Sequence, residues 1–246
     1  MVSKVYDCGD GIKFSRGGWE FDSTVASVFE EHAKKSIPGY SVMHEYAVKD
    51  IVSMYNMVGD KCLGVLDLGC SVGRLEELVK ESLPYKGNLD IVMTGVDSSE
   101  YMLQNTKELD NRFDYIRDDI GNYLKFKIGA SNIIVSLFTM QFIKPKDRFS
   151  IYSDILRHLD EDGIFILADK FEMDYRDDIS RRYDMFKYYN GYSPMEIKGK
   201  KIALEGVQFP LSIVDLDTLR SVGFKNVEEK YNHNGFKYFV CSRREV

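Results

Sequence analysis

The chain has 246 residues, of which 44% are hydrophobic and 29% are charged, a composition that fits a globular protein with a substantial core and excludes a disordered chain. Lysine and arginine number 33 against 39 for aspartate and glutamate, and the net charge of -6 disfavours DNA or tRNA as a partner. The first residues lack the apolar segment of a signal peptide, and no apolar run approaches the roughly 20 residues that span a bilayer, so we expect a cytoplasmic protein without membrane contact.

Cysteine and histidine residues give no metal-binding pattern. The four cysteines contain no C-x-x-C pair, and the four histidines form no ligand cluster with them. We therefore expect no structural metal.

Two helices are expected before residue 60. Asp22 and Ser23 can cap a first helix that runs through Ala33, because their side-chain oxygens accept hydrogen bonds from free amides at a helix start. Ser41 can cap a second helix, whose apolar residues recur at helical spacing. These apolar residues are Val42, Tyr46, Ile51 and Tyr55. A loop with the sequence Ser-Ile-Pro-Gly-Tyr, at 36–40, separates the two helices.

From Gly64 onward, short apolar runs alternate with helical stretches, which is typical of βαβ units around a mostly parallel sheet. The predicted strands are Val65–Leu68, Ile91–Val96, Phe113–Ile116, Ile133–Leu137 and Ile164–Ala168. The predicted helices between them are Leu75–Ser82, Tyr101–Leu109 and Arg148–Leu159.

Beyond Lys170 the alternation stops. Charged and aromatic stretches at 174–192 and 193–204 indicate a cap inserted after the fifth strand, before a last helix at Asp215–Ser221. The chain then ends in a predicted β-hairpin on one edge of the sheet, with strands at Asn226–Tyr231 and Phe236–Cys241 around an Asn-Gly turn. The pattern favours an α/β fold of one domain, residues 1–246, with an N-terminal helical lid at 1–60 and the inserted cap at 171–212.

The loop after the first predicted strand carries the clearest functional signal. Residues 65–74 read Val-Leu-Asp-Leu-Gly-Cys-Ser-Val-Gly-Arg, an apolar strand that enters a glycine-containing turn and opens a helix. At such a turn, backbone amides and the helix start face a crevice where a nucleotide-type cofactor can approach closely. The spacing Gly69-x-x-x-Gly73 lacks the middle glycine of the dinucleotide fingerprint and the lysine of a phosphate loop, so a pyrophosphate ligand is disfavoured. The alternative is a plain strand-to-helix turn.

Acidic residues follow the next two predicted strands. Asp97 can accept hydrogen bonds from both hydroxyls of a ribose, or it can cap the helix that begins near Ser99. Asp119 can accept from an adenine amino group while Ile120 packs on the ring, and the alternative for Asp119 is a solvated loop position. These placements together favour an adenosine-containing cofactor.

This set of residues resembles the class I S-adenosylmethionine-dependent methyltransferases. The resemblance implies a Rossmann-like fold with a seven-stranded, mostly parallel sheet whose last strand is antiparallel, and S-adenosyl-L-methionine as the cofactor. It also implies a site in which the first strand's loop surrounds the methionine end, the second the ribose and the third the adenine. The implied residues are, in that order, Asp67, Gly69, Cys70, Ser71 and Gly73; Asp97 and Ser98; and Asp119 and Ile120.

Within that superfamily the chain is most similar to the carboxy-S-adenosylmethionine synthases, along most of its length. The segments that carry the similarity are Trp-Glu-Phe-Asp at 19–22, Val-Ala-Ser-Val-Phe at 25–29, Ser-Ile-Pro-Gly-Tyr at 36–40, Asp-Leu-Gly-Cys-Ser at 67–71, Phe-Thr-Met-Gln-Phe at 138–142 and Asn-Gly-Tyr-Ser at 190–193. By this resemblance Tyr40 reaches the cofactor from the N-terminal helices, which act as a lid, and Tyr192 lies at the substrate. A role of Tyr40 in the core is the alternative.

Two positions depart from that family. Leu137 stands where the family has an asparagine near the cofactor, and Lys201 stands where the family has an arginine that engages the cofactor's carboxylate. A lysine keeps the charge but loses the planar fork that binds a carboxylate with two hydrogen bonds. For Lys200 and Lys201, a solvated charge pair is the alternative to a ligand role.

The sequence therefore favours an S-adenosylmethionine-dependent methyltransferase that acts on a small molecule, with His44 or Tyr189 as candidates for a catalytic base. One alternative is a carboxy-S-adenosylmethionine synthase that uses prephenate and holds the carboxylated form of the cofactor. Another is a non-catalytic protein that retains cofactor binding. The family resemblance also implies a homodimer.

Overall fold

The computed structural model describes residues 4–59, 61–83, 90–173 and 178–245. Seven strands form one central sheet in the order β5-β4-β3-β6-β7-β9-β8, and a separate two-stranded hairpin lies near the N-terminus. The sheet strands are β3 (Leu63–Leu68), β4 (Ile91–Asp97), β5 (Phe113–Arg117), β6 (Ser131–Leu137), β7 (Leu159–Lys170), β8 (Asn226–His233) and β9 (Phe236–Ser242). All neighbouring pairs are parallel except the two that involve β9. The predicted α/β fold with an antiparallel last strand is confirmed, and so is the terminal hairpin.

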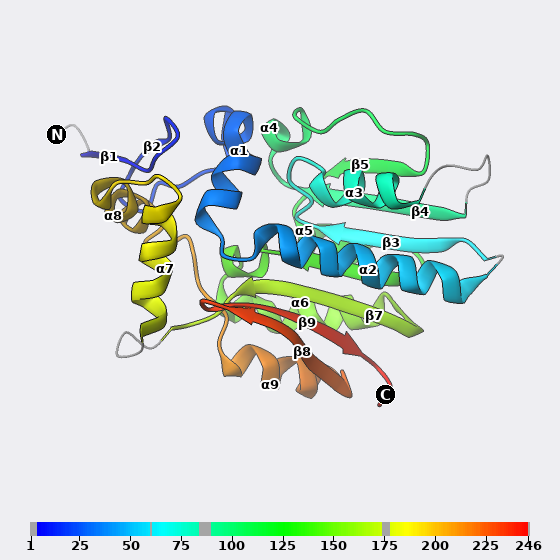
Figure 1. Cartoon of the computed structure of the whole chain (residues 1–246). Coiled ribbons are helices and arrows are strands. Elements are labelled where there is room, and N and C mark those ends of the chain that lie inside the picture. Colours follow the sequence, from blue (N-terminus) through cyan, green and yellow to red (C-terminus); the bar gives the residue numbers. More distant parts are fainter. Residues whose placement is uncertain (1–3, 60, 84–89, 174–177, 246) are drawn as a thin grey trace.

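Helices cover both faces of this sheet (Figure 1). The helices are α1 (Ser23–Ser36), α2 (Tyr40–Val58), α3 (Arg74–Ser82), α4 (Glu100–Leu103), α5 (Ile120–Phe126), a 3-10 turn at Met140–Phe142, α6 (Pro145–Arg157), α7 (Asp178–Tyr189), α8 (Pro194–Ala203) and α9 (Ile213–Val222). None of the described helices is both long enough and apolar enough to cross a membrane.

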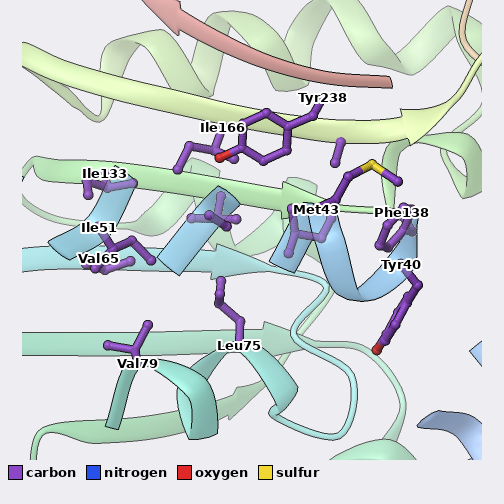
Figure 2. Close-up of a cluster of buried hydrophobic side chains, with 14 of the residues drawn as sticks. Tyr40, Met43, Ile51, Val65, Leu75, Val79, Ile133, Phe138, Ile166 and Tyr238 are labelled. Carbon is purple, nitrogen blue, oxygen red and sulfur yellow. The ribbon is translucent and has the colours of Figure 1, made fainter. Parts of the chain in front are cut away.

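Alternation along the central strands divides the core between the two faces. Val65 and Ile133 point to the face covered by α2 and α3, where they pack with Met43, Ile51 and Val79 (Figure 2). Their neighbours along the strands point to the opposite face and pack against α5, α6 and α9. Both faces of β3 and β6 are apolar because parallel strands with helices on both sides are buried on both sides.

Several predicted boundaries are wrong for local reasons. Ser41 does not cap α2, which begins one residue earlier at Tyr40, and Gly39 takes the cap position with a left-handed φ of 77°. The helix predicted at 101–109 extends only over α4, and Ser99 caps it by accepting a hydrogen bond from the Met102 amide at 3.2 Å. The helix predicted to end at Leu159 ends at Arg157, because β7 begins at Leu159.

The N-terminal hairpin lies together with α7 and α8 at one end of the sheet (Figure 1). The hairpin consists of β1 (Val5–Asp7) and β2 (Lys13–Ser15), and it packs on α8. The contact is close, because a Cβ at Gly199 in α8 would lie 1.9 Å from the carbonyl oxygen of Asp7. Within the predicted cap, residues 174–177 lie outside the described residues, and the remainder contains α7 and α8.

Arg148→Met is expected to lower the free energy of unfolding by about 3 kcal/mol, the low end of what losing one partner of a buried ion pair costs. The buried Arg148 guanidinium joins α6 to α9 through two 3.0 Å hydrogen bonds to the Asp215 carboxylate. Asp215 also accepts from the Ser212 amide at 2.9 Å, so its charge stays partly satisfied. Urea unfolding measures the loss. The control is Arg220→Met, which removes an exposed ion pair to Asp217 on the same helix and should cost less than about 1 kcal/mol. Equal losses of unfolding free energy in the two variants would contradict a stabilising role for the buried Arg148–Asp215 pair.

Candidate functional site

A cavity of about 390 Å³ lies at the carboxyl ends of β3, β4 and β6, beneath α1, the start of α2 and the end of α8. Its size falls in the usual range for small-molecule sites. Many of the residues singled out from the sequence line it: Tyr40, His44, Asp67, Gly69, Cys70, Ser71, Asp97, Ser98, Asp119 and Ile120. Gly73, Tyr189, Tyr192 and Lys201 do not line it.

The loop between β3 and α3 is folded tightly against the neighbouring strands. The amides of Gly69 and Cys70 both donate to the carbonyl oxygen of Val96, at 2.7 and 3.2 Å. Gly69 has a φ of +83°, and a Cβ there would lie 2.1 Å from the hydroxyl oxygen of Thr139. Only glycine fits this position without displacing the loop. The sequence pattern of an apolar strand followed by a glycine turn is thus explained by a backbone that passes close to another loop.

Asp97 fixes the cavity's second loop. Its carboxylate accepts from the Ser71 amide at 3.0 Å and from the Ser99 amide at 2.8 Å, which ties the loop after β3 to the loop after β4. Burial raises the pKa of Asp97 despite these hydrogen bonds. Asp97 does not cap α4, because Ser99 does. Its remaining acceptor capacity faces the cavity.

Asp119 has a structural role as well as a position in the cavity wall. It caps α5, a helix that the sequence pattern did not predict, by accepting from the Asn122 amide at 3.0 Å. Ile120, the first residue of that helix, is buried beside it. One short segment therefore presents a carboxylate and an apolar side chain to the same part of the cavity.

Two buried carboxyl groups lie behind the first loop. Asp67 is 3% exposed, and its Oδ1 has no hydrogen-bond partner among the described residues. Glu76, on α3, is fully buried, and neither of its carboxyl oxygens has a partner within that same part of the chain. Burial, reinforced by the charge of Asp97, raises the pKa of Asp67 to about 8, and burial together with Asp67 raises the pKa of Glu76 well above its usual range. With a pKa of about 8, Asp67 keeps its proton at neutral pH in the ligand-free protein, and a cationic group placed beside it in the cavity would favour the charged carboxylate.

Asp67→Asn is expected to raise the Tm of the ligand-free protein, and to raise it more at about pH 9 than at about pH 5. A carboxyl whose pKa is raised by folding contributes its full stabilisation below its pKa in the unfolded chain, about 4. This stabilisation is lost as the pH rises through the pKa in the folded protein, about 8 for Asp67. The amide does not ionise and avoids this loss. Thermal unfolding at the two pH values measures the difference, with the exposed Asp114→Asn as control. A change in Tm that is the same at both pH values would contradict a raised pKa for the buried Asp67 carboxyl.

The opposite wall is aromatic. The Tyr40 ring stacks on Phe138 (Figure 2), with ring centroids 5.5 Å apart. The centroid of the His44 ring lies 4.4 Å from that of Tyr40. The Nδ1–H of His44 donates to the carbonyl oxygen of Tyr40 at 2.9 Å, and burial lowers the pKa of His44 to about 4. The imidazole is therefore neutral, with a free lone pair on Nε2. Leu137 also lines this wall, where its side chain offers no polar contact.

Two neighbouring lysines in the last turn of α8 lie in opposite environments. Lys201 is exposed and forms an ion pair with Asp184 on α7 at 2.5 Å. Lys200 is buried and lines the cavity. Alignment on the family motif predicts that Lys201 binds the ligand. Lys200 faces inward instead, because it lies at helical spacing from the buried Ile197 and the cavity-lining Leu204.

The two tyrosines singled out beside the cap lie away from the cavity. Tyr189 is 79% exposed, and the Tyr192 hydroxyl is buried among polar groups of the N-terminal segment, where it donates to the Asp10 carboxylate. Sequence reasoning missed several polar cavity residues, namely His32, Ser36, Gln141 and Gln208, because they come from helices and loops that meet only in the fold. The described residues contain no group of three or more histidine, cysteine, aspartate or glutamate side chains that could hold a metal ion.

Comparisons with known proteins point to one kind of enzyme. A family model described as a methyltransferase domain matches residues 65–163. The carboxy-S-adenosyl-L-methionine synthase of Nautilia profundicola is 32% identical over 232 residues, which covers 91% of this chain and 94% of that protein. The protein of the same name from Campylobacter lari is 31% identical, with coverage of 91% and 94%.

Solved structures share the fold at lower identity. A putative S-adenosyl-L-methionine-dependent methyltransferase from Methanococcus maripaludis superposes with a TM-score of 0.60 at 17% identity, and covers 95% of this chain and 98% of its own. The plantazolicin methyltransferase BamL, solved with S-adenosylhomocysteine (SAH), gives a TM-score of 0.59 at 15% identity, with coverage of 90% and 94%. These similarities establish the Rossmann-like methyltransferase fold.

Proposed function

Since this chain belongs to the carboxy-S-adenosyl-L-methionine synthase family of S-adenosylmethionine-dependent transferases, we propose that it binds S-adenosylmethionine in the cavity and transfers its methyl group to a small molecule. The observation that supports this place for the cofactor is the buried Asp67 carboxyl beside the glycine turn, whose Oδ1 has no hydrogen-bond partner among the described residues. A cationic amino acid end fits there, and a side chain at Gly69 would meet Thr139 and displace the loop that forms this part of the cavity.

The proposed contacts follow the three loops. Asp67, Gly69, Cys70 and Ser71 surround the methionine end, and Gly73 turns the chain into α3 with a φ of +75°. Asp97 and Ser98 bind the ribose hydroxyls, Asp119 and Ile120 bind the adenine, and Tyr40 covers the cofactor from α2. All of these except Gly73 line the cavity, which supports the assignment.

S-adenosylmethionine, when bound, supplies a methyl group already activated by a positive sulfur. The protein's own residues need to align the acceptor and exclude water. We assign the base to His44, whose neutral Nε2 lone pair can take the acceptor's proton as the new bond to the methyl carbon forms and the carbon–sulfur bond breaks. Tyr189 is too exposed for this role.

A second candidate function is synthesis of carboxy-S-adenosylmethionine from a carboxylate donor such as prephenate. The names of the relatives favour it. The position of Lys201 does not, because Lys201 lies outside the cavity and is paired with Asp184. On this alternative Lys201 would act across a homodimer, at the site of a second copy.

Mass spectrometry distinguishes the candidates. Purified protein is incubated with S-adenosylmethionine and either a pool of small-molecule acceptors or prephenate. The proposed methyl transfer yields SAH and an acceptor heavier by one methylene. A carboxylated cofactor formed only with prephenate would establish the second candidate instead. Cofactor binding without either product would indicate a non-catalytic protein.

The same proposal gives the remaining parts their roles. We propose that α1 and α2, within 1–60, act as a lid and that 171–212 act as a cap on a single domain of 1–246; the hairpin packed on α8 joins the lid to the cap. We place the protein in the cytoplasm as a homodimer, and size-exclusion chromatography with light scattering tests the dimer.

A further inference from the structure

We propose that Arg74 binds the carboxylate at the amino acid end of the cofactor, from a position at the start of α3 where Glu30 and Glu77 hold its side chain. This inference rests on the proposed function for the identity and place of the cofactor. It adds a residue to the binding site and names the charged group that this residue recognises.

Arg74 connects the loop after β3 to the helix that covers the cavity. It is the first residue of α3, directly after Gly73, and it lines the cavity. Its Nε lies 3.2 Å from Oε1 of Glu30 on α1. Its Nη1 donates to Oε2 of Glu77, one turn further along α3, at 3.1 Å. Two carboxylates on different helices therefore fix the direction of the guanidinium.

The guanidinium keeps donors for a ligand. Glu30 is shared with Lys34 at 2.8 Å, and Glu77 is shared with Lys107 at 2.6 Å, so neither carboxylate is paired with Arg74 alone. Within the described part of the chain, the hydrogen bonds and ion pairs of Arg74 use Nε and Nη1. The two N–H groups on Nη2 remain for a further acceptor, and a carboxylate is the acceptor that a guanidinium binds most strongly.

Arg74 lies near the carboxyl group proposed to meet the cofactor's ammonium. Burial raises the pKa of the Tyr40 hydroxyl, and the charges of Glu30, Arg74 and Asp67 all act on that hydroxyl. Arg74 and Asp67 therefore lie on the same side of the cavity, close to one tyrosine. An amino acid end carries an ammonium and a carboxylate, and Asp67 and Arg74 offer a group of opposite charge to each.

The residues assigned so far leave the cofactor's carboxylate without a counter-charge. The methionine end is surrounded by Asp67, Gly69, Cys70 and Ser71, none of which is basic. Among the described residues that line the cavity, Arg74 directly follows this loop. A carboxylate enclosed in a cavity without a cation or hydrogen-bond donors would lose much of its solvation at a high cost. The guanidinium of Arg74 supplies both.

A pair of cofactor forms isolates this contact. Decarboxylated S-adenosylmethionine keeps the adenosine, the positive sulfur and the amino group, and lacks the carboxylate. In calorimetric titrations we expect the wild-type protein to bind S-adenosylmethionine at least roughly 10-fold more tightly than the decarboxylated form. Arg74→Met should weaken S-adenosylmethionine roughly 10- to 100-fold, the loss expected for hydrogen bonds between charged groups, and should not weaken the decarboxylated form. Arg74→Lys keeps the charge without the planar fork and should retain part of the preference.

The control is Lys107→Met, which removes an exposed cation from the same group of ion pairs, outside the cavity wall. It should leave both affinities within about twofold, because exposed charges are screened by salt. Thermal unfolding and the affinity for the decarboxylated form show that each variant folds. The proposal is overturned if the wild-type protein binds both forms equally, or if Arg74→Met keeps the preference, since backbone amides would then bind the carboxylate. Failure of the proposed function would differ, because the wild-type protein would then bind neither form.

Discussion

Gly69→Ala is expected to abolish measurable binding of S-adenosylmethionine and to lower the Tm. Two costs combine at this position. A side chain must adopt a φ of +83°, which costs about 1–2 kcal/mol for an alanine, and its Cβ would lie 2.1 Å from the Thr139 hydroxyl oxygen. The loop must therefore move away from the site where the methionine end of the cofactor is proposed to lie. Calorimetric titration with the cofactor and thermal unfolding measure the two effects.

Gly129→Ala is the matched control for this change. Gly129 has nearly the same φ, +82°, but a Cβ there has no neighbour within 4 Å. It should show the cost of the backbone conformation alone and leave cofactor affinity unchanged. If Gly69→Ala bound the cofactor as well as Gly129→Ala does, the glycine turn would have no role in the site.

Asp97→Ala should weaken S-adenosylmethionine binding by roughly 100-fold or more, because hydrogen bonds to a charged acceptor contribute about 1.5–3 kcal/mol each and the ribose offers two donors. The change also removes the acceptor of the Ser71 and Ser99 amides, so the two loops lose their link. Asp97→Asn keeps one acceptor oxygen and should fall between the alanine variant and the wild type. Calorimetry with S-adenosylmethionine measures all three.

The matched control for Asp97 is Asp114→Ala. Asp114 is an exposed carboxylate on the neighbouring strand β5, outside the cavity wall. Its loss changes the net charge by the same amount and should leave cofactor affinity within about twofold, since surface charges are screened by salt. Equal losses in the two variants would mean that overall charge, not the ribose contact, controls affinity.

The central strands β3 and β6 were predictable because they are buried on both faces and appear in the sequence as short, nearly continuous apolar runs. Parallel strands end at the same edge of a sheet, so the sequence also predicted that Asp67, Asp97 and Asp119 lie together at the carboxyl ends of β3, β4 and β5. The contacts of Asp97 within the protein could not be predicted. Its carboxylate accepts from amides of two separate loops, which come together only in the fold.

The elements around the cavity's outer end were harder to predict. The N-terminal hairpin is short, and it is stabilised by packing on α8, a contact between segments far apart in the sequence. Lys201 was singled out by its place in a family motif, while the direction of each lysine depends on the register of α8. That register follows from Ser193, whose hydroxyl accepts from the Glu196 amide at the start of the helix, and it turns Lys200 inward.

Binding of S-adenosylmethionine in the cavity is tested most directly by mass spectrometry. Freshly purified protein is soaked with S-adenosylmethionine, the unbound excess is removed, and the small molecules released on denaturation are identified. We expect the wild-type protein to release S-adenosylmethionine, SAH or the carboxylated cofactor in near-stoichiometric amount, and Asp97→Ala to release little. Release of no such compound from the wild-type protein would contradict cofactor binding.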